Sequence, residues 1–143
     1  MIAVDVPFVL SGSDARPPLR AYNQDAGADL PTLEEMVISP GKTINLPTGI
    51  SVEIPPGYWA MIVGRSSASS LLNLVVITGI IDQGYRGELF VRVLNPNNRP
   101  VTILKHQRIA QIIFMPLVIP KFHQVRDLSP GERGMKGFGS SGT

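Results

Sequence analysis

Short runs of apolar and β-branched residues alternate with turn-forming residues along most of the chain. Fourteen glycines and thirteen prolines interrupt the 143 residues, so no apolar run is long. Short runs between turn signals are typical of the strands of a β-sandwich or barrel and leave little room for helices. The sequence therefore predicts an all-β domain with strands at 43–54, 58–63, 73–81, 88–94, 101–104 and 109–114.

One strand shows its two faces clearly. Within Glu88 to Leu94, two-residue alternation places Leu89, Val91 and Val93 on one face and the polar residues on the other. We expect the first face to belong to the core. The preceding segment, 82–87, is expected to form a hairpin loop whose glycines are available for positive φ. Farther back, Leu71 and Leu72 are expected to close a short helical turn after residues 66–70.

Composition limits the class of protein. The length suits one domain, and 43% hydrophobic with 17% charged residues is normal for a folded chain. The sequence contains no cysteine, its N-terminus lacks the features of a signal peptide, and its apolar runs are too short to span a bilayer. We therefore expect a cytoplasmic protein without a membrane partner. The net charge of +2 comes without clusters of basic and aromatic residues, so no nucleic-acid partner is expected either.

The C-terminal segment differs from the rest. Residues 129–143 contain five glycines, four hydroxyl residues and one aromatic residue, too few apolar groups to build a core. Such a composition is typical of a flexible chain, but it also suits a mobile lid that becomes ordered over a ligand. The chain is thus divided into an all-β domain, residues 1–128, and a glycine-rich C-terminal segment, residues 129–143.

Three places carry side chains suited to chemistry on a phosphorylated ligand. Asp29 follows a small-residue stretch that we expect to be a polar loop, where it is either a turn former or a metal-binding group. Arg65 stands beside several serines after an apolar strand. This segment is either a phosphate-binding loop or a helix cap with a surface arginine. Asp82 is either an Asx-turn residue or a general base. The apolar residues before it would limit its solvation, which would favour the role of a base. Tyr85 follows closely enough to pack against a sugar.

Taken together, five segments resemble the five short motifs that the dUTPase family carries in fixed order. Any one match would be weak, whereas the whole set in order is specific and spans residues 26 to 142. The segments are Ala26-Gly27-Ala28-Asp29-Leu30, Gly64-Arg65-Ser66-Ser67, residues 79–88, Arg108-Ile109-Ala110-Gln111 and residues 133–142.

The resemblance implies a fold and an activity. Members of this family are homotrimers of jelly-roll-like distorted β-barrels of the β-clip type, with active sites shared between neighbouring chains. They hydrolyse dUTP to dUMP and pyrophosphate with Mg²⁺, which lowers dUTP and supplies dUMP for dTMP synthesis. The implied substrate is therefore dUTP, and the implied cofactor is Mg²⁺.

The resemblance also implies roles for individual residues. Asp82 would be the general base for the water that attacks the α-phosphorus, and Asp29 would help hold Mg²⁺ through water. Backbone groups of Gly79 and Ile81 would bind uracil, and Tyr85 would pack beneath the deoxyribose and exclude a 2′-hydroxyl. The phosphate ligands would be Arg65, Ser66, Ser67 and Gln111. The C-terminal lid would contribute Arg133, Phe138, Gly139, Ser140 and Ser141, with Phe138 stacked on uracil.

Three alternatives compete with this hypothesis. A dCTP deaminase shares the fold but needs a glutamate three residues before Asn95, where this chain has Arg92, a group that cannot act as a base. A binding or regulatory module could keep the trimer with little catalysis. A trimeric structural protein would require the order of the five motifs to be accidental. A pyrophosphate-release assay separates the diphosphatase from all three.

Overall fold

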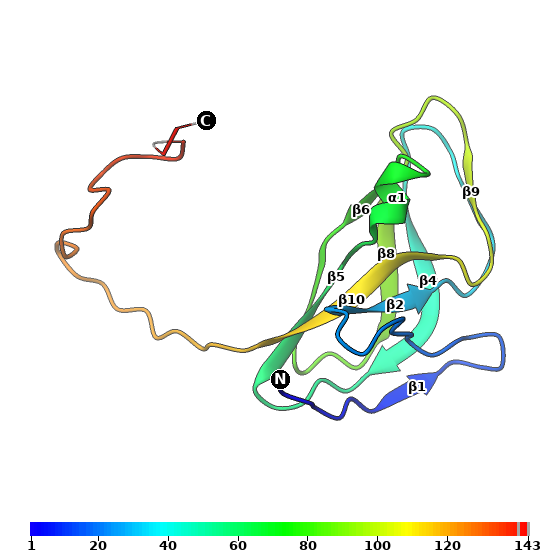
Figure 1. Ribbon diagram of the computed structural model, residues 1–143, viewed down its shortest axis with the longest axis horizontal. Coiled ribbons are helices and arrows are strands. Elements are labelled where there is room, and N and C mark those ends of the chain that lie inside the picture. Colours follow the sequence, from blue (N-terminus) through cyan, green and yellow to red (C-terminus); the bar gives the residue numbers. More distant parts are fainter. Residues whose placement is uncertain (140, 143) are drawn as a thin grey trace.

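Two four-stranded antiparallel sheets form the body of the protein (Figure 1). The computed structural model describes residues 1–139 and 141–142. One sheet has the strand order β1 (Phe8–Leu10), β4 (Thr43–Val52), β8 (Glu88–Leu94) and β6 (Val75–Ile77). The other has the order β2 (Gly27–Pro31), β10 (Arg108–Pro116), β5 (Tyr58–Gly64) and β7 (Gly79–Ile81). Two further strands, β3 (Met36–Ile38) and β9 (Val101–Ile103), pair with each other, and α1 (Ser66–Ser70) is one short helix. The predicted all-β fold is confirmed.

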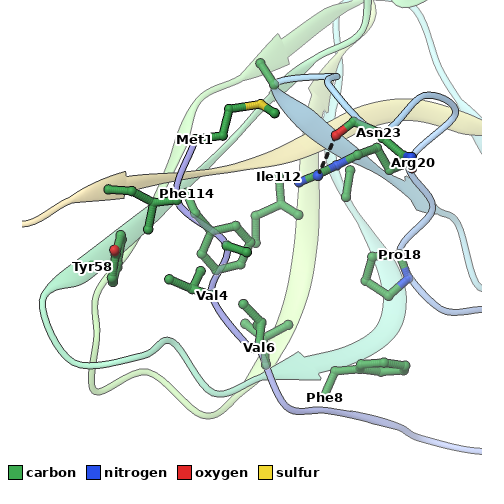
Figure 2. Close-up of a pocket in the computed structure, with 15 residues that line it drawn as sticks. Met1, Val4, Val6, Phe8, Pro18, Arg20, Asn23, Tyr58, Ile112 and Phe114 are labelled. Atoms are coloured by element: carbon green, nitrogen blue, oxygen red, sulfur yellow. Dashed lines mark hydrogen bonds between the residues drawn. The ribbon is translucent and has the colours of Figure 1, made fainter.

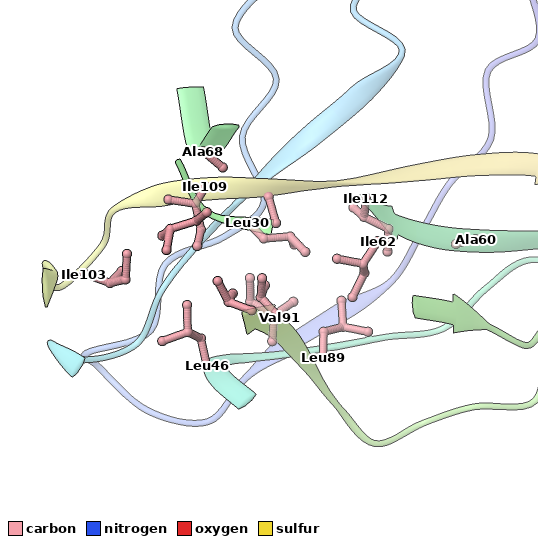
Figure 3. Close-up of a cluster of buried hydrophobic side chains, with 14 of the residues drawn as sticks. Leu30, Leu46, Ala60, Ile62, Ala68, Leu89, Val91, Ile103, Ile109 and Ile112 are labelled. Carbon is pink, nitrogen blue, oxygen red and sulfur yellow. The ribbon is translucent and has the colours of Figure 1, made fainter. Parts of the chain in front are cut away.

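Aliphatic side chains fill the space between the two sheets (Figure 3). Leu89, Val91 and Val93 are fully buried, as the alternation in β8 predicted. They belong to one buried cluster with Leu30 and Ile62 of the opposite sheet. Burial of each such side chain contributes about 1.5–3 kcal/mol relative to exposure, which makes this layer the main source of stability.

A bulge in β4 lets the N-terminal segment pack closely. The pairing of β4 with β8 shifts register between Pro47 and Ser51, and Gly49 inside this bulge has φ +67. A methyl group on Gly49 would lie 2.8 Å from the Cβ of Ala15, so glycine is required for both conformation and space. The buried Thr48 hydroxyl donates to the Leu89 carbonyl (2.6 Å) and accepts from the Ile50 N–H, which satisfies the disrupted backbone.

Most predicted strands are observed, with corrections in two regions. The segment expected as one strand, 73–81, is two strands, β6 and β7, which lie in different sheets. Strands β1, β2 and β3 were missed. In particular, the loop expected around Asp29 is wrong, because β2 carries this residue at its centre. The helical turn after residue 65 is confirmed as α1, with Leu71 as its C-cap.

The hairpin that carries residues 82–87 is opened along its length. Its ladder joins β6 to β8, from Val75 opposite Leu94 to Ile77 opposite Arg92. Beyond Ile77 the two arms separate, because β7 pairs with β5 in the other sheet. Within the described residues, β7 is an edge strand with one unpaired side. Neither Gly84 nor Gly87 has a positive φ, so the expected use of that conformation in the loop is wrong.

The chain leaves the sandwich after β10. The described residues from Leu117 onward are exposed, and Figure 1 shows this segment extending away from both sheets. In the described part of the chain, no helix is long and apolar enough to cross a membrane.

Candidate functional site

Pairing of β2 and β5 with β10 brings three of the five motifs together. Asp29 in β2 lies opposite Gln111 in β10, and Gln111 lies opposite Val63 in β5. Arg65 follows directly after β5, and its backbone N–H donates to the Ile109 carbonyl (2.8 Å). The first, second and fourth motifs therefore meet at one end of this sheet.

A carboxylate between two guanidinium groups forms the centre of this cluster. One Asp29 oxygen lies 2.9 Å from Nε of Arg65, and the other accepts a hydrogen bond of 3.2 Å from Arg108. The Asp29 side chain is only 10% exposed, whereas those of Arg65 and Arg108 are 32% and 38% exposed. The three side chains together carry a net charge of +1. This arrangement suits an anionic ligand.

Polar groups around the cluster add further donors. The Gln111 side-chain amide donates to the Gly64 carbonyl (3.3 Å), and a methyl group on Gly27 would collide with Gln111. Ser66 is exposed and Ser67 is half-buried in the first turn of α1. A cavity of about 310 Å³ is lined by Arg65, Ser66 and neighbouring residues. The predicted phosphate-binding residues Arg65, Ser66, Ser67 and Gln111 are thus neighbours in one subunit.

Sequence reasoning assigned no role to Arg108, although it opens the fourth motif. Arg108 reaches Asp29 because β10 pairs with β2, where it lies opposite Pro31. The apolar pattern did not indicate that the segment of β2 pairs with β10, because we expected this segment to be a loop. The only available signal was the position of Arg108 within the motif.

The second group of candidate residues lies at the tip of the opened hairpin. The Asp82 carbonyl accepts a hydrogen bond from the Tyr85 N–H (3.0 Å), which closes the turn. No described residue donates a hydrogen bond to the Asp82 carboxylate, so its side chain is not used as an Asx turn. The side chain is exposed, and the expected limit on its solvation is therefore not seen within one subunit.

Tyr85 is held against the hairpin backbone. Its hydroxyl donates to the Glu88 carbonyl (2.7 Å), and its ring lies so close to Gly87 that any side chain there would collide with it. About 40% of Tyr85 stays exposed. The tyrosine thus offers a fixed and partly exposed ring surface in the hairpin that follows β7.

Two contacts fasten the hairpin tip to the turn between β4 and β5. The Gly57 N–H donates to the side-chain oxygen of Gln83 (3.0 Å), and Arg86 lies 3.5 Å from Glu53. Arg86 also donates to the Gln83 carbonyl (2.8 Å). These contacts restrict the position of Asp82 and Tyr85 relative to the sandwich.

The two groups of candidate residues lie far apart within the chain. Ile81 lies opposite Ala60, so Asp82 stands near Trp59 at one end of β5, while Arg65 follows the other end. At about 3.3 Å per residue, the six residues from Trp59 to Arg65 span about 20 Å. Within one chain, Asp82 is therefore well separated from the Arg65 cluster.

The C-terminal segment places its candidate residues outside the sandwich. Arg133 donates to the Gly137 carbonyl (3.0 Å), and Gly139 has a positive φ. Phe138 is fully exposed, and Ser141 is exposed. Ser140 lies outside the described residues. None of these described side chains packs on the Arg65 cluster or on the hairpin of its own subunit.

A larger cavity, of about 680 Å³, lies elsewhere. Figure 2 shows it between the N-terminal segment, with Val4 and Val6, and the residues Tyr58, Ile112 and Phe114. Its lining is mainly apolar and includes neither Arg65 nor Asp82. A triphosphate needs several cations or hydroxyl groups, so this cavity is a poor candidate for its site.

The side chains that the structure describes do not form a metal site by themselves. No group of three or more His, Cys, Asp or Glu residues among them is arranged to hold a metal ion. Mg²⁺ is bound by oxygen ligands, among them carboxylates, phosphates and water, and both Asp29 oxygens already contact guanidinium groups. The contact of Asp29 with Mg²⁺ through water stays a prediction.

Comparisons with known proteins agree on one family. A family model described as dUTPase matches residues 13–142. A deoxyuridine 5'-triphosphate nucleotidohydrolase from Leifsonia xyli subsp. xyli is 41% identical, over 97% of this chain and 91% of that protein. The protein of the same name from Clostridioides difficile is 40% identical, over 90% of this chain and 92% of that protein.

Solved structures lead to the same family. The dUTPase of Staphylococcus bacteriophage 80alpha, solved with dUPNHPP, has a TM-score of 0.92 and 32% identity, covering 99% of this chain and 100% of that one. A second structure is a mutant dUTPase from phage phi11 of S. aureus, which describes the coordination of a structural Mg(II) ion. It has a TM-score of 0.82 and 27% identity, and the match covers 87% of this chain and 98% of that one.

Proposed function

The chain belongs to the dUTPase family, and we propose that it hydrolyses dUTP to dUMP and pyrophosphate. The observation that carries this proposal is the opened hairpin with Asp82 at its tip, whose carboxylate accepts no hydrogen bond from the described residues. Its arms lie in different sheets, so the unpaired edge of β7 presents backbone N–H and C=O groups. Such groups can pair with the edge of a pyrimidine base.

Recognition of the nucleoside would come from this hairpin. We assign uracil to the backbone of Gly79 and Ile81, and the deoxyribose to the exposed part of the Tyr85 ring. The hydrogen bond from the Tyr85 hydroxyl to the Glu88 carbonyl fixes the ring, so a ribose 2′-hydroxyl would meet a surface that cannot move aside. The site would then distinguish dUTP from UTP by shape.

Hydrolysis requires a base and a fixed triphosphate. Asp82 would accept a proton from a water molecule whose oxygen attacks the α-phosphorus. The bond from this phosphorus to the bridging oxygen breaks, and the electron pair leaves with pyrophosphate. Arg65, Ser66, Ser67 and Gln111 would hold the phosphates in line, since catalysis of this reaction is mainly positioning and charge neutralisation.

We also propose Mg²⁺ as the cofactor. The ion would be bound by the oxygens of the triphosphate, where it supplies charge neutralisation. No part of the proposed role of Asp82 or Arg65 requires a metal ligand from the protein. The Mg(II) ion in the phage phi11 enzyme supports the presence of the metal in this family.

The active sites would be shared between subunits of a homotrimer. The separation of about 20 Å between Asp82 and Arg65 along β5 supports this proposal, because one chain alone lacks a complete site. Exposed apolar residues of the β6–β8 ladder, Val75 and Ile77, are available for subunit contacts. The C-terminal segment supports it as well, because it extends away from both sheets of its own chain (Figure 1).

The remaining proposals concern the C-terminal lid and the location of the protein in the cell. We propose that residues 129–143 close over the bound nucleotide, with Arg133, Phe138, Gly139, Ser140 and Ser141 as the contacting residues, while residues 1–128 form the all-β domain. A cytoplasmic location remains a prediction. Neither a membrane nor a nucleic acid is proposed as a partner.

A nucleotide panel tests the proposal. The purified protein is incubated with dUTP, UTP, dCTP and dTTP in Mg²⁺, and both pyrophosphate and ammonia are measured. We expect pyrophosphate from dUTP and little from the others. Ammonia from dCTP would indicate a deaminase instead, and nucleotide binding without either product would indicate a binding or regulatory module.

A further inference from the structure

We propose that Asp29 is a positioning residue that fixes the guanidinium groups of Arg65 and Arg108, and that it is not a ligand of the metal ion. The inference rests on the proposed function, because it takes the Arg65 cluster to be the triphosphate site. It gives Asp29, in the first motif, a role that consists of contacts within the protein and does not involve the metal ion.

The position of Asp29 suits a fixed anchor. Its backbone exchanges two hydrogen bonds with Leu19 (2.7 and 3.0 Å), and β10 lies on the other side of β2 with Gln111 opposite Asp29. The side chain is 10% exposed, and each carboxylate oxygen contacts a different arginine. Both carboxylate oxygens are thus engaged by charged groups of the protein itself.

Arg65 is held at three points as a result. Nε lies 2.9 Å from Asp29, Nη1 donates to the Arg108 carbonyl (2.8 Å), and the backbone N–H donates to the Ile109 carbonyl (2.8 Å). Arginine is a long side chain with many rotamers, and ordering it on ligand binding weakens affinity. Because Asp29 orders it beforehand, the exposed third of Arg65 is already in place when the phosphates arrive.

Charge and positioning predict opposite effects of Asp29→Asn. If only net charge mattered, loss of a negative group beside the triphosphate would strengthen binding, with or without metal. If Asp29 held Mg²⁺, binding would weaken only when the metal is present. If Asp29 positions the two arginines, binding should weaken to a similar degree in both conditions.

The test measures the affinity for the non-hydrolysable α,β-imido analogue of dUTP by titration calorimetry, once in EDTA and once in excess Mg²⁺. We expect Asp29→Asn to raise the dissociation constant at least about tenfold in both, the scale of one lost charge-assisted hydrogen bond. In steady-state assays KM should rise more than kcat falls. Unchanged or tighter binding in EDTA, or a loss confined to Mg²⁺, would overturn the proposal.

Matched variants complete the experiment. Asp14→Asn removes a carboxylate from an exposed ion pair with Lys105, and should leave both dissociation constants at the wild-type value. If Asp29→Asn does not fold, as judged by circular dichroism, Asp29→Glu keeps the charge but displaces the carboxylate from Arg65 and Arg108: weaker binding in EDTA supports the proposal, and unchanged binding overturns it. If the wild type neither binds the analogue nor cleaves dUTP, the proposed function itself fails.

Discussion

Gly87 is the position where one methyl group should disturb the sugar site most selectively. A methyl group there would lie 2.5 Å from the Tyr85 hydroxyl oxygen and 2.7 Å from the adjoining ring carbon. Carbon contacts are normally about 3.5–4.0 Å long, so the ring must move by about 1 Å in Gly87→Ala. The backbone of Gly87 does not have a positive φ, so alanine adds no conformational strain.

Two consequences follow for Gly87→Ala. The hydrogen bond from Tyr85 to the Glu88 carbonyl is lost or distorted, which should cost about 1 kcal/mol and lower the melting temperature by roughly 3–5 °C. The displaced ring should lower kcat/KM for dUTP by about tenfold to a hundredfold, since a misplacement of about 1 Å can have an effect of this size. Pyrophosphate release and thermal unfolding measure the two effects.

Gly84→Ala is the matched control, because it lies in the same hairpin and a methyl group there meets nothing within 4 Å. We expect wild-type kinetics and stability for this variant. If Gly87→Ala also keeps the wild-type kcat/KM, the Tyr85 ring has no role in binding the sugar. If both variants lose activity equally, the hairpin is sensitive to any change and the proposed contact is not specific.

Three further predictions concern other parts of the chain. Tyr85→Ala should raise kcat/KM for UTP relative to dUTP, and an unchanged ratio of the two substrates counts against steric exclusion of the 2′-hydroxyl. Deletion of residues 132–143 should leave a folded oligomer with little activity; loss of folding, seen by circular dichroism, would assign this segment to the core. A hydrogen bond from Lys105 lowers the pKa of the Asp14 carboxyl below 3.8, so Lys105→Gln should raise this pKa in an NMR titration. Because the folded-state pKa is lowered, the pair stabilises the fold above about pH 4 and loses this effect as the pH falls through the lowered value.

Local pattern was sufficient for the strands that face the core on one side. The alternation in β8 predicted both its limits and its buried face, because residues two apart share a face in any strand. The pattern failed for β2, where Gly27, Ala28 and Pro31 are poor strand formers and pairing with β10 and Leu19 determines the conformation. It also failed to divide segment 73–81, because both of its parts are apolar and only the pairing partners differ.

The candidate site was predictable to a similar extent. Motif order identified Asp82, Tyr85 and the Arg65 loop as candidate site residues. The structure brings the Arg65 loop together with Gln111. The ion pairs of Asp29 could not be predicted, since they depend on the register of β10 against β2 and β5. The separation of Asp82 from Arg65 along β5 agrees with the shared active sites that the resemblance implies, but the apolar pattern alone does not predict it.

Co-expression of two inactive variants tests most directly whether Asp82 of one subunit acts on a triphosphate held by Arg65 of another. Asp82→Asn and Arg65→Gln should each lose at least about two orders of magnitude in kcat when expressed alone. In an equal mixture of randomly assembled oligomers, about one site in four would combine the intact Asp82 of one variant with the intact Arg65 of the other. We predict that the mixture recovers about a quarter of the wild-type pyrophosphate release, whereas activity no higher than that of the separate variants would contradict a shared site.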